Sequence, residues 1–339
     1  MQARTVQAAQ REGRVVVYSV LSNKAAAPLV QGFKALYPGI EVEYDGEGGS
    51  TETDARFRAE VAAGQASADV VWSSAMDLQM KLVADGYAMH HASPEAAMLP
   101  PWAVYQDLAW GTTFEPVVFI YNKARVSAAD VPQDRAAFAR LLDAEPDKYR
   151  GKVTAFDIEK SGVGFMFAVQ DRALATHPDQ LLHAFGRAHL QPSAGTGNML
   201  TKVASGEYLL GYNIMGGYAL SRSGKDLPGL GVVIPKDYTV VLSRVMFISK
   251  HARNPNAARL WADYVLSARG QQVIGTAMEL YALREGVDAP YTAATLAPLL
   301  GAGARPMKLD LTLLDDLQPA RHRAFVAAWK AAVRPVTAR

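Results

Sequence analysis

Small hydroxyl-bearing residues and glycines gather in four short loops of this sequence. Each loop lies between a strand-like apolar run and a stretch with helical spacing. Main-chain amides at a helix N-terminus favour negative charge, and small side chains let an anion approach the backbone. These loops therefore predict the binding of an anionic oxygen cluster. The residues are Ser22 and Asn23; Gly49, Ser50 and Thr51; Ser73 and Ser74; and Ser161 and Gly162.

The same residue types also have a purely structural use. Ser, Thr, Asn and Gly cap helices and shape turns without binding anything. For any one of the four loops, that structural role is the more frequent one. The presence of all four in one chain shifts the interpretation towards a binding site.

The elements that would position these loops alternate between strand and helix. Residues 14–18 form a β-branched run typical of a buried parallel strand, and residues 25–37 carry apolar residues at helical spacing. Further strands are predicted at 40–44 and 68–72. Ligands of open α/β sheets bind beyond the carboxyl ends of the strands, which is where the loops fall. The sequence thus predicts an α/β fold.

A second set of such units follows in the chain. Strands are predicted at 116–121, 153–156 and 208–214, and 240–248 is strand-like again. The length of 339 residues exceeds that of an ordinary single domain. Since no tandem repeat or long linker separates the two sets, we expect two lobes joined by strands.

The composition excludes several classes of function. The formal charge is +2 with scattered Lys and Arg, so we expect no nucleic-acid partner. No apolar run approaches the roughly 20 residues that span a bilayer, so no membrane insertion is expected. The chain has no Cys, and it contains no nucleophile elbow, zinc-protease motif or P-loop. We expect no enzyme, no cofactor and no metal.

Five segments in a fixed order carry a resemblance to a known family. They are VVVY at 15–18, FKALYPGIEVE at 33–43, SADVVWSS at 67–74, FIYNK at 119–123 and the stretch from ISKHARNPNAA to GQ at 248–271. Together they resemble the type II periplasmic solute-binding proteins of ABC importers, in the branch that binds ferric iron or organophosphates. The similarity extends over nearly the whole chain.

This resemblance implies a two-lobed fold in which each lobe is an open mixed sheet flanked by helices. Two crossover strands would join the lobes, with the ligand cleft between them. The first lobe is expected to comprise residues 1–113 and 243–295. The second is expected to comprise residues 114–242 and 296–339.

By the same resemblance, Thr113 and Glu115 lie at the first crossover and Arg244 at the second. The planar guanidinium of Arg244 suits a phosphate or carboxylate, with a surface or hinge salt bridge as the alternative. Glu115 could pair with Arg244 or bind a ligand amine or hydroxyl. Gly217 and Tyr218 follow a strand of the second lobe, where Tyr218 is expected to contact an organic ligand or to pack in the core.

Iron-binding members of this branch are recognised by a histidine, an acidic residue and tandem tyrosines. This sequence has Ser22-Asn23, Ser73-Ser74 and Gly217-Tyr218 at the corresponding places. Fe(III) requires anionic oxygen donors, and here only Tyr218 supplies one. Ferric binding is therefore the alternative and not the first expectation.

We predict a periplasmic receptor that captures a small organic anion by lobe closure and delivers it to an ABC permease. The anion would be a phosphorylated compound, a phosphonate or a carboxylate. The protein is expected to act as a monomer. A ligand-sensing module of a signalling system is a further alternative. The N-terminus lacks the pattern of a signal peptide, as a mature secreted protein also would.

Overall fold

The computed structural model describes residues 2–278 and 280–334, and the chain divides into two compact units. Unit 1 comprises Met1–Phe114, Leu242–Leu296 and Met307–Leu314, and unit 2 comprises the rest. The expected boundaries assigned 307–314 to the second lobe. This segment instead belongs to unit 1, where the Leu309 N–H donates to the Trp102 carbonyl at 2.8 Å.

Unit 1 is built on a mixed six-stranded sheet with the order β2-β1-β3-β12-β5-β4. Strands β1, β2 and β3 are parallel, whereas β12 runs antiparallel to β3 and β5. Val15 and Val17 of the first strand are fully buried, as its β-branched sequence predicts. The strands are β1 (Arg14–Ser19), β2 (Glu41–Asp45), β3 (Val70–Ser73), β4 (Val104–Tyr105), β5 (Ala109–Gly111) and β12 (Val245–Ile248).

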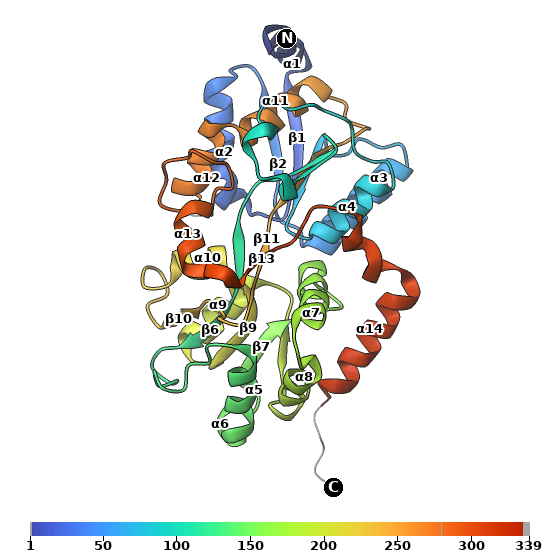
Figure 1. Ribbon diagram of the computed structural model, residues 1–339. Helices are drawn as coiled ribbons and strands as arrows, with labels where there is room; N and C mark the ends of the chain where they lie inside the picture. The colour runs from blue at the N-terminus through green and yellow to red at the C-terminus, as the bar shows by residue number, and fades with distance from the viewer. Residues whose placement is uncertain (1, 279, 335–339) are drawn as a thin grey trace. The chain divides into compact units, whose positions relative to one another are not determined.

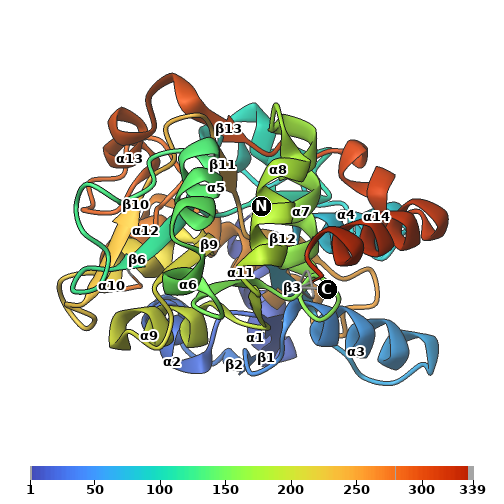
Figure 2. The ribbon, with the colours of Figure 1, turned by 90° about the horizontal axis from the view of Figure 1, so that it is seen from below.

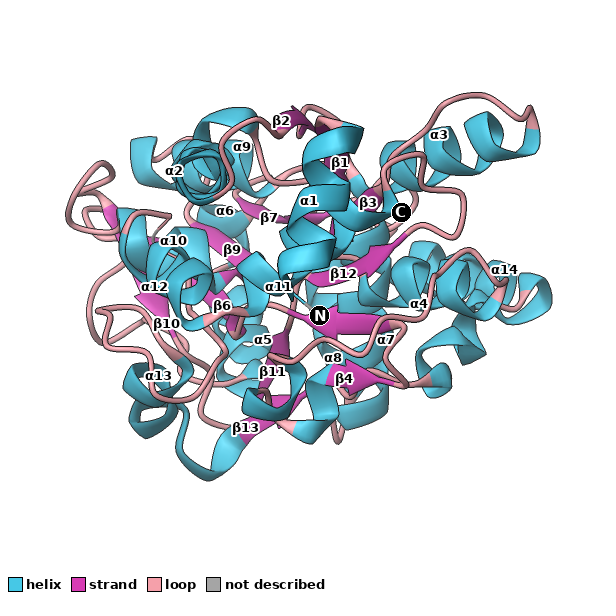
Figure 3. Ribbon diagram, turned by 90° about the horizontal axis from the view of Figure 1, so that it is seen from above, coloured by secondary structure: helices cyan, strands magenta, loops and turns pink. Residues whose placement is uncertain are grey.

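Helices flank this sheet, and α1 lies beside α11 (Figure 3). The Glu12 carboxylate at the end of α1 accepts hydrogen bonds from the N–H groups of Asn256 and Ala257 at 3.0 and 2.8 Å. A carboxylate at a helix N-terminus is favoured by the partial positive charge there. The helices are α1 (Gln2–Glu12), α2 (Asn23–Leu36), α3 (Ser50–Ala62), α4 (Met76–Ala84), α11 (Pro255–Leu266) and α12 (Ala268–Thr276).

Unit 2 contains a second mixed sheet with the order β13-β11-β6-β9-β7-β8, and β10 pairs with β6 (Figure 1). The pairing of β6 with β9 is antiparallel and irregular between Val118 and Ile120. The strands are β6 (Glu115–Asn122), β7 (Val153–Phe156), β8 (Gln191–Ser193), β9 (Leu210–Met215), β10 (Leu230–Val233), β11 (Thr239–Leu242) and β13 (Ala304–Pro306).

The core of unit 2 is an aromatic cluster under α5 and α8. Tyr212 stacks on Phe119 with ring centroids 5.1 Å apart and meets Phe138 edge-on at 5.4 Å. The helices are α5 (Arg135–Ala144), α6 (Pro146–Tyr149), α7 (Gly162–Leu174), α8 (Pro178–Arg187), α9 (Thr196–Ser205), α10 (Gly216–Arg222) and α14 (Pro319–Ala332). The remaining segments are α13 (Ala293–Leu300), η1 (Ala96–Met98), η2 (Pro101–Ala103), η3 (Gly301–Gly303) and η4 (Leu311–Leu317).

The strand-like run 240–248 is two strands and not one. Strands β11 and β12 belong to different sheets and are separated by Ser243 and Arg244. All nine residues of the run are buried, including the polar pair Ser243 and Arg244 that separates the two strands. Among the residues that the structure describes, no helix is long and apolar enough to cross a membrane.

Candidate ligand-binding site

Three of the four predicted loops meet at one edge of the unit 1 sheet. Strands β1, β2 and β3 are parallel neighbours, with Tyr18 opposite Asp45 and Ser19 opposite Trp72. Their carboxyl ends therefore lie together, and each is followed by a helix N-terminus. The loops that contain Ser22, Gly49 and Ser73 are thus brought to the same edge.

A cavity of about 230 Å³ opens at this edge of the sheet. Its wall combines hydroxyl groups, two carboxylates and one guanidinium. Ser19 and Thr53 are buried, with 2% and 7% of their surface exposed. The lining residues are Tyr18, Ser19, Asp45, Gly48, Glu52, Thr53 and Arg56.

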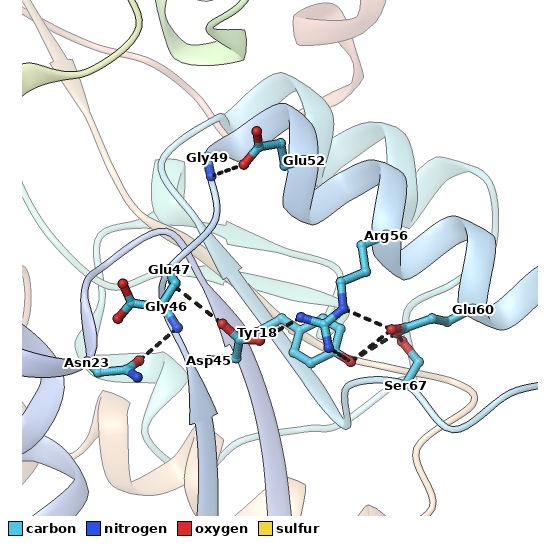
Figure 4. A network of polar contacts seen from close by, with 10 residues as sticks. All are labelled: Tyr18, Asn23, Asp45, Gly46, Glu47, Gly49, Glu52, Arg56, Glu60 and Ser67. Atoms are coloured by element: carbon cyan, nitrogen blue, oxygen red, sulfur yellow. Dashed lines mark hydrogen bonds and ion pairs between the residues drawn. The ribbon is translucent and has the colours of Figure 1, made fainter.

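Arg56 of α3 is held by three partners within this wall (Figure 4). Its Nη1 donates to Asp45 at 2.6 Å and its Nε to Glu60 at 2.9 Å. Its Nη2 donates to the Tyr18 hydroxyl at 2.8 Å, and the guanidinium carbon lies 4.0 Å from the centre of that ring. Because two carboxylates already neutralise Arg56, this edge of the sheet has no surplus positive charge.

The pKa shifts in this network follow from the same contacts. Burial and the hydrogen bond to Glu60 raise the pKa of Tyr18 to about 12, so its hydroxyl stays protonated at neutral pH. The hydrogen bond from Arg56 lowers the pKa of Asp45. Burial acts to raise the pKa of Glu60. Hydrogen bonds from Ser67 and Arg56 outweigh this effect, and the pKa of Glu60 is lowered overall. The wall thus presents acceptors at neutral pH.

The loop residues at this edge have clear structural partners. The Ser22 Oγ accepts from the Ala25 N–H at 3.3 Å and caps α2. The Asn23 Oδ1 accepts from the Gly46 N–H at 2.9 Å, which ties the first loop to the second (Figure 4). The Gly49 N–H donates to the Glu52 carboxylate at 3.1 Å. These contacts show capping roles for Ser22 and Gly49 and a loop-bridging role for Asn23, and ligand contacts of the three residues stay predictions.

The other hydroxyl residues of this edge lie close by. Ser50 is half-buried and Thr51 is exposed in the first turn of α3. Ser73 and Ser74 are buried, and the Ser73 Oγ accepts from the Ala75 N–H at 3.2 Å. Just beyond them, burial raises the pKa of Asp77 to about 7.

Thr113 and Arg244 are joined in unit 1 through the backbone. The Arg244 N–H donates to the Thr113 Oγ1 at 2.9 Å, and the Thr113 N–H donates to the Ser243 Oγ at 3.2 Å. Only 2% of the Arg244 surface is exposed, which excludes a salt bridge at the surface, while the hinge salt bridge stays the alternative. Glu115 begins β6 in unit 2 and is fully buried, so its carboxylate is screened little by water.

The remaining candidates lie in unit 2. The Ser161 Oγ accepts from the Gly164 N–H at 3.2 Å and caps α7, in which Gly162 is the first residue. Gly217 is buried in the first turn of α10, and Tyr218 follows it half-buried. Both helix starts follow a strand of the unit 2 sheet, as the sequence predicts.

Sequence reasoning missed the charged part of the unit 1 cavity. Asp45 is the last residue of β2, and Glu52, Arg56 and Glu60 recur at intervals of four along α3. That spacing places acidic, basic and acidic side chains on one helical face, a signal that was available in the sequence. Within 2–278 and 280–334, no three His, Asp or Glu side chains gather as a metal site would require.

A family model described as bacterial extracellular solute-binding protein matches residues 19–272. The substrate-binding protein of an ABC transporter from Agrobacterium tumefaciens is 35% identical in sequence. The alignment covers 95% of this chain and 94% of that one, with a TM-score of 0.89. No protein among those with curated descriptions matches the sequence.

Two more distant structures share the fold. The periplasmic binding protein AfuA from Actinobacillus pleuropneumoniae, with fructose-6-phosphate bound, is 20% identical with a TM-score of 0.74, covering 95% of this chain and 98% of that one. Apo ferric ion-binding protein A from Pasteurella haemolytica is 18% identical with a TM-score of 0.69. The alignment covers 95% of this chain and 96% of that one.

Proposed function

The chain belongs to the bacterial extracellular solute-binding protein family, and we propose from this premise that it captures a small organic anion for an ABC permease. Proteins of this family bind solutes and do not transform them, so the chain is a binding protein and not an enzyme. The family places it outside the cytoplasm, with a solute and a permease as its partners. The periplasm is the compartment we propose, and a monomer is the form.

The observation that carries the anionic ligand is the buried guanidinium of Arg244. The Arg244 side chain is 2% exposed, and its planar guanidinium suits a phosphate or a carboxylate. Its backbone is fixed by Thr113, so the guanidinium is positioned by the fold. We assign the acidic group of the ligand to Arg244. AfuA, which shares this fold, holds a phosphorylated sugar.

The unit 1 cavity supports hydroxyl or amine groups on the same ligand. Asp45 and Glu52 accept hydrogen bonds there, whereas Arg56 is already paired. An acidic group would meet a net negative charge in this cavity, because Asp45 and Glu52 outnumber Arg56 and like charges repel. A ligand with an acidic group and separate hydroxyl or amine donors satisfies both observations.

Native mass spectrometry of the purified protein tests the ligand class. We expect a retained compound whose mass matches a phosphorylated compound, a phosphonate or a carboxylate. Calorimetric titration with that compound, and with its neutral dephosphorylated or amidated form, should show binding of the acidic form only. Stoichiometric binding of Fe(III), or equal affinity for the neutral form, would contradict the proposal.

A further inference from the structure

A cavity of about 900 Å³ lies wholly within unit 2 and is lined by none of the residues assigned above to the ligand. Parts of α5, α7, α8, β9 and α14 surround it, and Figure 2 shows α5, α7 and α8 together on the viewer's side. We propose that this cavity is a second binding site, for a small neutral molecule with an alcohol or carboxamide head and an apolar body.

The floor of the cavity is a buried polar network centred on Asp171 of α7. Its carboxylate accepts hydrogen bonds from the Arg135 Nε at 3.0 Å, the Tyr212 hydroxyl at 2.7 Å and the Tyr238 hydroxyl at 2.9 Å. The Asn213 Nδ2 donates to the same carboxylate. Four donors satisfy a carboxylate, so Asp171 needs nothing from a ligand.

Two atoms of this network have no hydrogen-bond partner among the residues that the structure describes. They are the Nη2 of Arg135 and the Oδ1 of Asn213, on side chains that are 6% and 7% exposed. Both residues line the cavity. Buried polar groups in native proteins are almost always paired, so an orphaned donor and an orphaned acceptor beside one cavity point to a missing partner. That partner must accept from Arg135 and donate to Asn213.

The local charges select a neutral head group. Arg135 also pairs with Asp237 at 2.9 Å, so one guanidinium already serves two carboxylates. An anionic head would add a third negative group and face the Asn213 oxygen, whereas a cationic head would face the guanidinium. An alcohol or carboxamide both donates and accepts without a net charge.

One part of the cavity wall suits an apolar body. Phe156, Phe325 and Trp329 line it from β7 and α14, whereas Arg140, Arg172 and other charged residues line another part. Aromatic walls around a few fixed polar groups are typical of sites for small organic molecules, and the volume falls in the range of such sites.

The backbone at Asn213 adds an independent observation. Asn213 has a φ of 53° inside β9, in the left-handed region that asparagine adopts more readily than most residues other than glycine. Such conformations are enriched at functional sites. Here this backbone conformation carries the amide that lines the cavity.

Benzamide and benzyl alcohol are the probes for this site, and benzoate is the charged control. We expect saturable calorimetric binding of the neutral probes with Kd about 1 mM or tighter, as for a small fragment. Benzoate should bind at least tenfold more weakly. Absence of saturable binding by both neutral probes, or equal binding of benzoate, would overturn the proposal.

Three variants locate the binding. Asn213→Gly removes the acceptor and tolerates the positive φ, and Ala328→Trp on α14 obstructs the cavity. Each of these two variants should weaken the binding of benzamide at least tenfold. Ala327→Trp is the matched control, since Ala327 is also exposed on α14 but does not line the cavity. Circular dichroism checks folding, and benzamide binding that survives Asn213→Gly in a folded protein rejects the site.

Discussion

Single side chains decide what each surface of unit 1 can bind. Arg56 is close to the predicted loops but is engaged by Asp45 and Glu60, so it does not add positive charge for a ligand. Arg244 is buried and held through its backbone by Thr113. Residue type alone therefore does not tell what an arginine offers a ligand, because Arg56 is neutralised by its two carboxylate partners.

We predict that Arg244→Ala weakens binding of the acidic ligand by about 2 kcal/mol or more, because a charge-assisted hydrogen bond is lost. Calorimetry with the compound found by mass spectrometry measures this change. Arg187→Ala, which removes an exposed ion pair with Asp143, is the control and should leave affinity unchanged. Unchanged affinity in folded Arg244→Ala would remove Arg244 from the site.

Asp77 predicts a pH dependence of stability. Burial raises its pKa from 3.8 to about 7, so the folded protein binds a proton over a pH range in which the unfolded chain has lost it. The free energy of unfolding should therefore fall, by a few kcal/mol at most, as pH rises from about 4 to above 7. Urea unfolding at pH 5 and pH 8 measures this fall.

The variant Asp77→Asn tests the assignment, because an amide resembles the protonated carboxyl and does not titrate. It should flatten the pH dependence and stabilise the protein at pH 8. Asp288→Asn, at an exposed position, should leave the pH dependence of the free energy of unfolding unchanged. If the free energy of unfolding of Asp77→Asn still falls as pH rises, another group titrates.

At the scale of elements, Asp69 joins three parts of unit 1. It is fully buried beside β3, accepts from the Val16 N–H of β1 at 2.9 Å, and accepts from the N–H and Nδ2 of Asn254 before α11 at 3.0 and 2.9 Å. One carboxylate thus connects residues far apart in the sequence. Its partners lie 53 and 185 residues away, so no local pattern indicates this role.

We predict that Asp69→Ala lowers the free energy of unfolding by about 3 kcal/mol or more, since three donors lose a buried acceptor. Asp69→Asn keeps one acceptor oxygen and should lower the free energy of unfolding by less. Urea unfolding of both variants measures the difference. A loss below about 1 kcal/mol for Asp69→Ala would mean that water replaces the carboxylate.

Element types were predictable where local chemistry is strong. The β-branched run of β1 and the Ser22 and Ser161 caps are recognisable from the sequence, because strand burial and helix capping depend on neighbouring residues. The pairing of β11 and β12 was not predictable. The polar pair Ser243 and Arg244 between them lies at the crossover that the resemblance implied, but hydrophobicity does not tell which sheet each strand joins.

At the scale of the whole molecule, we predict that the two units close on the ligand. A ligand can shift a conformational equilibrium only by binding one state more tightly, and hinge closure is a common form of this. Small-angle scattering should show a smaller radius of gyration when the protein is saturated with the retained compound. An unchanged scattering profile at saturation would contradict closure.

The sequence by itself determined the family, the α/β class and the loops that follow the parallel strands. Ordered motifs and periodic hydrophobicity are local properties, so they can be read without coordinates. Only the tertiary structure showed that Arg56 is paired, that Arg244 is buried and that Arg135 and Asn213 face a cavity in unit 2. Charge, burial and cavities depend on residues brought together from distant parts of the chain. Of the small loop residues that first indicated an anion site, Ser22 and Ser161 cap helices by their observed contacts, and the prediction now rests mainly on the buried Arg244.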